Sequence, residues 1–274
     1  MTAPDPADLS LADLDAVAEA APLVNAVTNN VTVNDVAQVI LHWGGLPVMS
    51  DDEREVGTMV AGADACLLNM GTVSQAGEAT MLGAGESANE HGVPVVVDPV
   101  GVGATPTRDR VAERLVSELD VAAIKGNYGE ITALTGEDAE VRGVESVGEY
   151  SDIAATAVAC AQAYDTVVVA SGETDIVATG EAAYEVTAGH PMMGEVVGTG
   201  CMLGGTVATL AGVLEDAEAA LLGTAAFGLA GEAAADGGFG AYHGPASYHV
   251  AFKDAIAGLR DADTDGVADR VERV

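Results

Sequence analysis

The sequence predicts a three-layer αβα sandwich built on a mainly parallel β-sheet. Short β-branched runs alternate with segments of helical spacing from Leu23 to Ala170, which is the pattern of consecutive βαβ units. Apolar residues make up 49% of the 274 residues, so the chain can bury a large core without disulfides or metals. No linker or repeat interrupts this pattern. We therefore expect one α/β domain over residues 1–274, with helices on both faces of the sheet.

The predicted elements follow one another in a regular order. Five short apolar runs are expected to form buried strands: Leu23–Val27, Ala65–Leu68, Pro94–Val97, Val121–Ile124 and Thr166–Ala170. Four segments between them have helical spacing: Asn34–His42, Gln75–His91, Arg108–Glu118 and Ile153–Tyr164. A predicted hairpin of Ile176–Ala178 and Ala182–Val186, joined through Thr179-Gly180-Glu181, adds an antiparallel edge to the sheet. From Thr199 onward the chain is predicted to be helical and rich in small residues.

The charge balance is strongly acidic. The chain has 43 acidic and 10 basic residues, which gives a formal net charge of −33 at pH 7. Such a surface repels nucleic acid and anionic lipid, so neither is expected as a partner. The acids are spread along the whole chain, which favours an origin in a cell that holds molar salt, where the Debye length is about 3 Å. An ordinary acidic protein is the alternative interpretation.

Export and membrane insertion are not expected. No apolar run reaches the roughly 18 to 20 residues of a membrane span. The N-terminus carries acidic residues where a signal peptide carries Lys or Arg. The cysteines Cys66, Cys160 and Cys201 fit neither a disulfide framework nor a metal-binding C-x-x-C pair. The sequence therefore predicts a cytoplasmic protein.

Polar residues and glycines follow each of the predicted strands. These stretches are Thr28–Asn29, Asn69–Thr72, Asp98–Thr105, Lys125–Glu130 and Ser171–Gly172. Because the carboxyl ends of parallel strands meet at one edge of a sheet, we expect a ligand site there.

The run Gly198-Thr199-Gly200-Cys201 opens the long apolar helix. Converging backbone N–H groups and the positive end of a helix form an anion hole that suits a phosphoryl group. The alternative is a glycine-rich turn with a buried cysteine. Gly83–Ala88 superficially matches a dinucleotide fingerprint, but it lies inside a predicted helix, so a nicotinamide dehydrogenase is not expected. Neither a Walker A sequence nor a protein-kinase signature is present.

Together these residues resemble the hydroxyethylthiazole kinase family of the ribokinase-like superfamily. The similarity covers about Pro22 to Gly258 and rests on Pro47–Met49, Leu68–Thr72, Asp98–Thr105, Asn127 with Glu130, and Gly198–Leu203. The resemblance implies a ribokinase-like kinase domain that uses ATP to phosphorylate the alcohol of 4-methyl-5-(2-hydroxyethyl)thiazole in thiamine salvage. It also implies Mg²⁺ and a homotrimer with sites at subunit boundaries.

Residue roles follow from the resemblance, each with a structural alternative. The positions that match thiazole-binding residues are Asn25, Val27, Met49 and Gly198, although a methionine after a strand also commonly fills the core. The positions expected to contact ATP are Lys125, Ser171 and Gly200. Asp98 and Glu130 are expected to hold Mg²⁺, directly or through water, with loop capping as the alternative. Asn69, Gly71 and Thr72 are expected to reach a neighbouring subunit's site.

Cys201 is the expected catalytic residue, at a position where related kinases carry an Asp base. Phosphoryl transfer depends more on alignment than on a strong base, so we assign Cys201 to positioning, with proton acceptance as a second role. A kinase for hydroxymethylpyrimidine or pyridoxal would instead be expected to carry Asp at this position. A non-catalytic thiazole-binding protein would not need both Asp98 and Glu130.

The acidic C-terminal tail, residues 261–274, contains one more pattern. Asp261, Asp263, Asp265, Gly266 and Glu272 match the calcium loop D-x-D-x-D-G-x₅-E. A weak structural Ca²⁺ site is one interpretation. A solvated tail is the favoured one, because the sequence ends two residues later, without an exiting helix.

Overall fold

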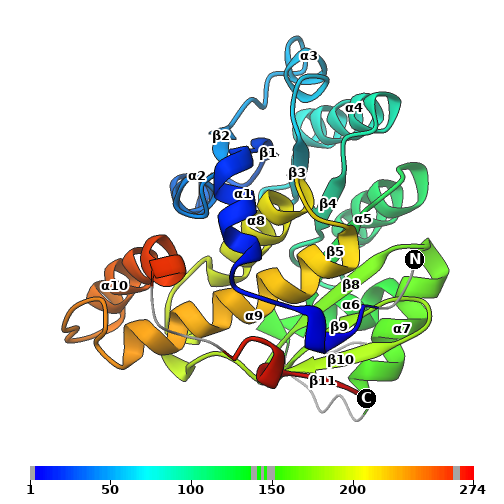
Figure 1. Cartoon of the computed structure of the whole chain (residues 1–274). Helices are drawn as coiled ribbons and strands as arrows, with labels where there is room; N and C mark the ends of the chain where they lie inside the picture. The colour runs from blue at the N-terminus through cyan, green and yellow to red at the C-terminus, as the bar shows by residue number, and fades with distance from the viewer. Residues whose placement is uncertain (1–3, 137–140, 143–144, 147–151, 262–265) are drawn as a thin grey trace.

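A nine-stranded sheet forms the centre of the protein, seen here as a computed structural model (Figure 1). The structure describes residues 4–136, 141–142, 145–146, 152–261 and 266–274. The strand order is β11-β10-β9-β8-β5-β4-β3-β1-β2. The parallel strands are β1 (Leu23–Val27), β2 (Leu46–Val48), β3 (Ala65–Asn69), β4 (Val95–Asp98), β5 (Ala123–Asn127) and β8 (Val167–Ser171). The antiparallel strands are β9 (Asp175–Ala178), β10 (Ala183–Val186) and β11 (Val271–Arg273). A separate two-stranded sheet pairs β6 (Val141–Arg142) with β7 (Glu145–Ser146).

Helices cover both faces of the sheet, as Figure 1 shows. One face is covered by α1 (Asp13–Ala20), α2 (Val33–His42), α8 (Thr199–Ala211), α9 (Asp216–Ala235) and α10 (Pro245–Gly258). The other face is covered by α3 (Val56–Val60), α4 (Gln75–His91), α5 (Pro106–Glu118), α6 (Tyr128–Leu134) and α7 (Ile153–Tyr164). Short 3₁₀ turns are η1 (Pro6–Asp8), η2 (Pro191–Glu195), η3 (Leu259–Asp261) and η4 (Ala268–Arg270). The predicted three-layer αβα architecture with a mainly parallel sheet is confirmed.

Alternation along the strands divides the core into two clusters. On β1, Val24 and Ala26 face the cluster under α8 and α9, whereas Val27 faces the cluster under α4. Helix α8 is buried on every side from Met202 to Ala211, because it lies between the sheet and other helices. Its N-terminus therefore has a fixed position relative to the sheet.

Several elements differ from those predicted. Strand β5 was expected over Val121–Ile124, but it begins at Ala123 and continues through Asn127, because Lys125, Gly126 and Asn127 extend the pairing with β8. Six further helices and strands, α1, β2, α3, α6, β6 and β7, lie in segments for which no helix or strand was predicted.

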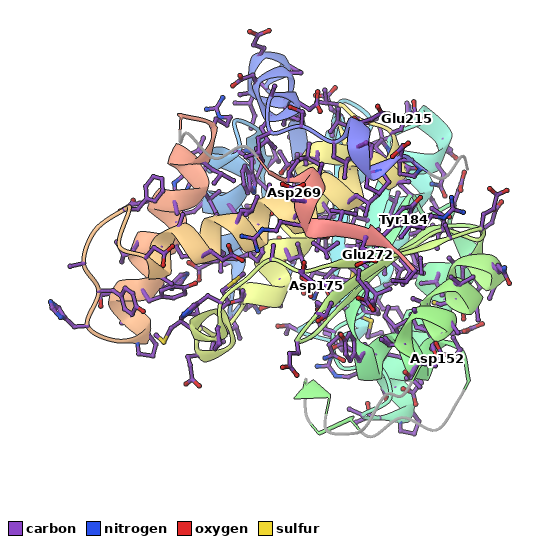
Figure 2. All side chains as sticks on the ribbon, turned by 60° about the horizontal axis from the view of Figure 1, so that its bottom comes forward. Asp152, Asp175, Tyr184, Glu215, Asp269 and Glu272 are labelled. Carbon is purple, nitrogen blue, oxygen red and sulfur yellow. The ribbon has the colours of Figure 1, made fainter. Side chains whose placement is uncertain are left out.

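The C-terminal residues differ from the expected solvated tail. Val271–Arg273 form β11, and Glu272 lies opposite Glu185 of β10 (Figure 2). Arg270 binds Glu232 at 2.7 Å, which anchors this segment to α9. Of the calcium-loop pattern, Asp263 and Asp265 lie outside the described residues, so the Ca²⁺ hypothesis stays a prediction.

A buried hydrogen bond between α2 and α8 gives a test of this packing. The indole Nε1 of Trp43, the chain's one tryptophan, donates to Thr206 Oγ1 at 2.9 Å. Thr206→Val should leave this buried N–H without an acceptor and lower the free energy of unfolding by about 1–3 kcal/mol. The measurement is urea unfolding in high KCl, followed by tryptophan fluorescence.

Thr224→Val is the matched control, because the Thr224 hydroxyl makes only the intrahelical bond to Ala220 among the described residues. Equal losses for the two variants would show that the indole bond contributes nothing.

Candidate active site

The carboxyl ends of the parallel strands bring the predicted site residues to one edge of the sheet. Asp98 ends β4, Lys125 lies in β5 next to it, and Asn69 ends β3 on the other side. Helix α8 points its N-terminus at this edge and supplies Gly200 and Cys201. The polar centre of the molecule therefore lies between the middle strands and one helix end.

Asp98 and Lys125 form a buried charged pair at this centre. Their relative exposures are 0% and 4%, and Lys125 Nζ lies 3.6 Å from Asp98 Oδ1. Asn69 Nδ2 donates to Asp98 Oδ2 at 2.6 Å, whereas Oδ1 has no hydrogen-bond partner among the described residues. Burial raises the pKa of Asp98 to about 7, although the Lys125 ammonium opposes the rise. One carboxylate oxygen is thus held in place and the other is left for a ligand.

The first turn of α8 lies directly against the Lys125 ammonium. A Cβ atom added to Gly200 would come within 2.9 Å of Lys125 Nζ, so glycine permits this approach. Gly198 caps the helix with φ +94°, and a Cβ there would meet Thr32 Cγ2 at 2.4 Å. A cation next to the positive end of a helix is unfavourable unless an anion lies between them. The arrangement therefore suits phosphate oxygens.

Both carboxylate oxygens of Glu130 accept hydrogen bonds from the backbone. Its Oε1 accepts the N–H of Gly101 at 2.6 Å, and its Oε2 accepts the N–H of Asn127 at 2.7 Å. With Asn127 it forms a capping box at the start of α6. The structure thus shows the loop-capping role that the sequence left as the alternative. Burial raises the pKa of Glu130, and nearby Lys125 opposes the rise.

Cys201 is half-buried beside this pair. Burial raises the pKa of its thiol, and the Asp98 carboxylate raises it further, while Lys125 opposes the shift. The raised pKa disfavours the thiolate, which is the form that could accept a proton, and so supports positioning for this residue.

The residues predicted to bind the acceptor are only partly brought together. Asn25 is buried on β1, and its Nδ2 donates to the carbonyl of Ser50 at 3.4 Å, next to Met49. Met49 packs against the core cluster that also contacts Cys201. Val27, in contrast, packs in the core on the α4 face.

The other end of the edge carries Ser171. Its Oγ donates to the Gly126 carbonyl at 3.3 Å, so it lies beside the end of β5. Asp175, labelled in Figure 2, accepts the N–H of Gly172 at 2.9 Å and closes the turn that follows. Burial raises the pKa of Asp175 to about 6. The edge thus runs from Ser171 on β8 to the Met49 loop after β2.

Two site residues were not predicted from the sequence. Arg108 of α5 donates to the carbonyls of Met70 and Gly71 at 3.0 Å each and to that of Val100, which joins the loops after β3 and β4. Asn29, after β1, contacts both Asn69 and Cys201. No sequence signal identified either role, although Asn29 belongs to a predicted strand-end stretch.

Asn69 and Gly71 were expected to reach a neighbouring subunit. Within the chain, the Asn69 side chain donates to Asp98, and a Cβ atom on Gly71 would meet Asn29. Both residues lie at the site of their own chain, and their contact with a neighbouring subunit, like that of Thr72, stays a prediction.

The fold is ribokinase-like, and the family matched below makes the protein a small-molecule kinase. The fold is similar to that of a ribokinase-like superfamily protein from Enterococcus faecalis, with a TM-score of 0.63 at 11% identity over 94% of this chain and 91% of that one. A model of the family described as "Hydroxyethylthiazole kinase family" matches residues 14–262, and the chain belongs to this family.

Similar proteins agree with this assignment. The chain is 66% identical over 268 residues to the hydroxyethylthiazole kinase of the halophile Natronomonas pharaonis, covering 97% of this chain and 94% of the relative. The structure of a hydroxyethylthiazole kinase protein from Pyrococcus horikoshii superimposes with a TM-score of 0.84 at 33% identity, covering 96% of this chain and 98% of that one. The predictions of family, of an enzyme and of halophilic relatives are confirmed.

The state of Cys201 generates a prediction for kinase turnover. Cys201→Ala should slow turnover by about 10- to 100-fold and leave measurable activity. The reason is that Cys201 is expected to position the alcohol and is not required to accept its proton. Asp98→Ala should cost at least about 10³-fold, because Lys125 loses its partner at the centre of the site. Steady-state kinetics in molar KCl, with thermal melts to check folding, measure both.

Cys201→Asp should remain active as a carboxylate base. A folded Cys201→Ala enzyme with no turnover would contradict the positioning role.

Proposed function

We propose that the protein transfers the γ-phosphate of ATP to the alcohol of 4-methyl-5-(2-hydroxyethyl)thiazole, as a cytoplasmic enzyme of thiamine salvage. The observation that carries the proposal is the convergence of Lys125, the α8 N-terminus and Asp98 on one point. Family membership supports the substrate. The continuous nine-stranded sheet supports one kinase domain over residues 1–274. Among the described residues, no helix is both long and apolar enough to cross a membrane.

The order of strands supports a division of the site into two halves. ATP would lie at the β5–β8 end, where Lys125, Gly200 and Ser171 are the proposed contacts. The thiazole would lie at the β1–β2 end, near Asn25, Met49 and Gly198, whereas Val27 packs in the core on the α4 face. The buried Oδ1 of Asn25 has no hydrogen-bond partner among the described residues, so this end of the site keeps an open acceptor. The two reacting groups would meet above β4 and β3.

Mg²⁺ fits the residues between these two halves. In the described part of the chain, no three His, Cys, Asp or Glu side chains are grouped to hold a metal. Mg²⁺ does not need such a group, because it keeps several waters and binds substrate phosphates. The Oδ1 of Asp98, which has no hydrogen-bond partner among the described residues and lies 3.6 Å from Lys125 Nζ, is the proposed direct ligand, and Glu130, with both oxygens engaged, would act through water. When bound, Mg²⁺ would neutralise phosphate charge.

The chain's own residues would act mainly by alignment. The transition state of phosphoryl transfer is loose, so positioning and charge stabilisation supply most of the catalysis. Lys125 and the N–H groups at the start of α8 would stabilise charge on the transferred group. Cys201 would orient the attacking alcohol. A hydroxymethylpyrimidine or pyridoxal kinase and a non-catalytic thiazole-binding protein are not favoured, because the family match is to a thiazole kinase.

A homotrimer with sites at subunit boundaries is supported by an apolar surface. Most of the exposed large hydrophobic residues in the described part of the chain lie on α2, β2, α10 and two site loops: Val31, Val33, Leu41, Leu46, Val197 and Val250. Helix α2 contacts both β2 and α10, so these side chains lie on neighbouring elements. On so acidic a protein, an apolar surface next to the site fits a subunit contact.

A substrate competition assay tests the function. The purified protein in molar KCl with Mg-ATP is offered the hydroxyethylthiazole, hydroxymethylpyrimidine and pyridoxal. We expect turnover of the thiazole alcohol above both others, because Cys201 replaces the Asp of the other kinases. Exclusive turnover of either other alcohol would overturn the proposal.

Salt should control assembly and activity together. Each subunit carries a net charge of −33, so weak screening should separate the subunits. Dialysis to about 0.1 M salt should lower the mass measured by light scattering, and activity should fall in parallel. A stable and active trimer at low salt would contradict this prediction.

A further inference from the structure

Asn29 is a buried carboxamide at the turn between β1 and α2. Its Oδ1 accepts the backbone N–H groups of Val31 at 2.9 Å and Thr32 at 3.0 Å. These two bonds fix the amide plane at the start of α2. The Nδ2 group is thereby the atom that faces the site, where it contacts Thr32 Oγ1 at 2.8 Å, Asn69 Oδ1 at 2.9 Å and Cys201 Sγ at 3.4 Å.

Asn69 continues this hydrogen-bonded chain to the charged pair. Its Oδ1 accepts from Asn29 Nδ2 and from the N–H of Gly71 at 3.0 Å. The Nδ2 of Asn69 must therefore face Asp98, where it donates to Oδ2. A flipped amide would place acceptors against acceptors, so both carboxamides have one allowed orientation. The contacts join Cys201 to Asp98 through two side chains.

The surrounding backbone leaves room for Asn29. A Cβ atom on Gly71 would lie 2.8 Å from the Asn29 Nδ2 atom. Thr32, which Asn29 binds through both its backbone and its hydroxyl, lies against Gly198 at the start of α8. Two glycines thus allow three loops to approach this one amide.

We propose that Asn29 is a positioning residue for phosphoryl transfer, which holds the Cys201 thiol in register with Asp98 through Asn69. The identity of the acceptor rests on the function proposed above, but the positioning role applies to any alcohol bound at Cys201. The role matters because a misplacement of about 1 Å in a transfer reaction can cost about 100-fold in rate. Asn29 itself exchanges no proton with the reacting groups.

Asn29→Asp tests the proposal with an isosteric change. Aspartate keeps the oxygen that accepts the N–H groups of Val31 and Thr32, but it cannot donate to Cys201, Asn69 or the Thr32 hydroxyl. We expect kcat to fall about 10- to 100-fold, while KM for ATP changes less than about twofold, because the Lys125 side of the site is untouched. Should this variant fail to fold, Asn29→Ser retains a capping oxygen and gives the same comparison.

Asn89→Asp is the matched control. Asn89 lies on α4, away from the site, and its Nδ2 donates to the backbone carbonyl of Asp120 at 2.8 Å. This variant should retain the parent kcat. If Asn29→Asp also retains the parent kcat, the proposal is wrong.

A double-mutant cycle separates positioning from folding. Combined with Cys201→Ala, Asn29→Asp should cost less than the product of the two separate effects, because the thiol it orients is absent. Independent effects that multiply would overturn the proposal. If the parent enzyme prefers another alcohol, only the proposed substrate is refuted. The ratio of variant to parent kcat, measured with that alcohol, then tests the role of Asn29.

Discussion

Two opposite charges lie side by side inside this protein, and much of the surrounding structure depends on keeping them paired. Burying a carboxylate or an ammonium group costs free energy unless the group has partners. Removing one member of a buried pair leaves the other charge buried and unpaired. Asp98 and Lys125 are carried by adjacent strands, so the sheet sets their separation. Asn69 holds one oxygen of Asp98, and Gly200 allows the helix end to reach Lys125. Arg108 joins the loops after β3 and β4, and Glu130 fixes the loop after β4 to the end of β5 at Asn127.

Sequence reasoning succeeded where structure is decided locally. Helical spacing predicted α4 to its bounds, and the structure shows the local reason: Ser74 caps its start and Gly92 ends it in the left-handed conformation. Helix α6 was missed because Asn127 is both the last residue of β5 and the N-cap of the helix, which leaves no loop between them. Likewise β11 is a short, mostly polar edge strand that shows no strand pattern.

The same distinction, between local structure and distant contacts, separates the site residues that were predicted from those that were not. Asp98, Lys125 and Gly200 were identified because they follow or lie in strands and a helix start, where topology alone brings residues together. Asn29 was not, because its role depends on Cys201, 172 positions away. Glu130 illustrates a third case, since the N-x-x-E spacing that suggested a metal ligand is also the spacing of a capping box. The spacing predicted where Glu130 lies, but it did not show which groups its carboxylate binds.

The carboxylates and the lysines of this acidic protein are placed in different ways. Carboxylates project from distant parts of the molecule, such as Asp152, Glu215 and Asp269 in Figure 2. The chain's two lysines, in contrast, are both paired with aspartates: Lys125 with Asp98, and Lys253 with Asp35 at 2.9 Å. Their side chains are 5% and 20% exposed. Amine-directed chemistry, whether enzymatic acylation in the cell or cross-linking reagents in the laboratory, therefore meets a protein whose lysine amines are both held in ion pairs.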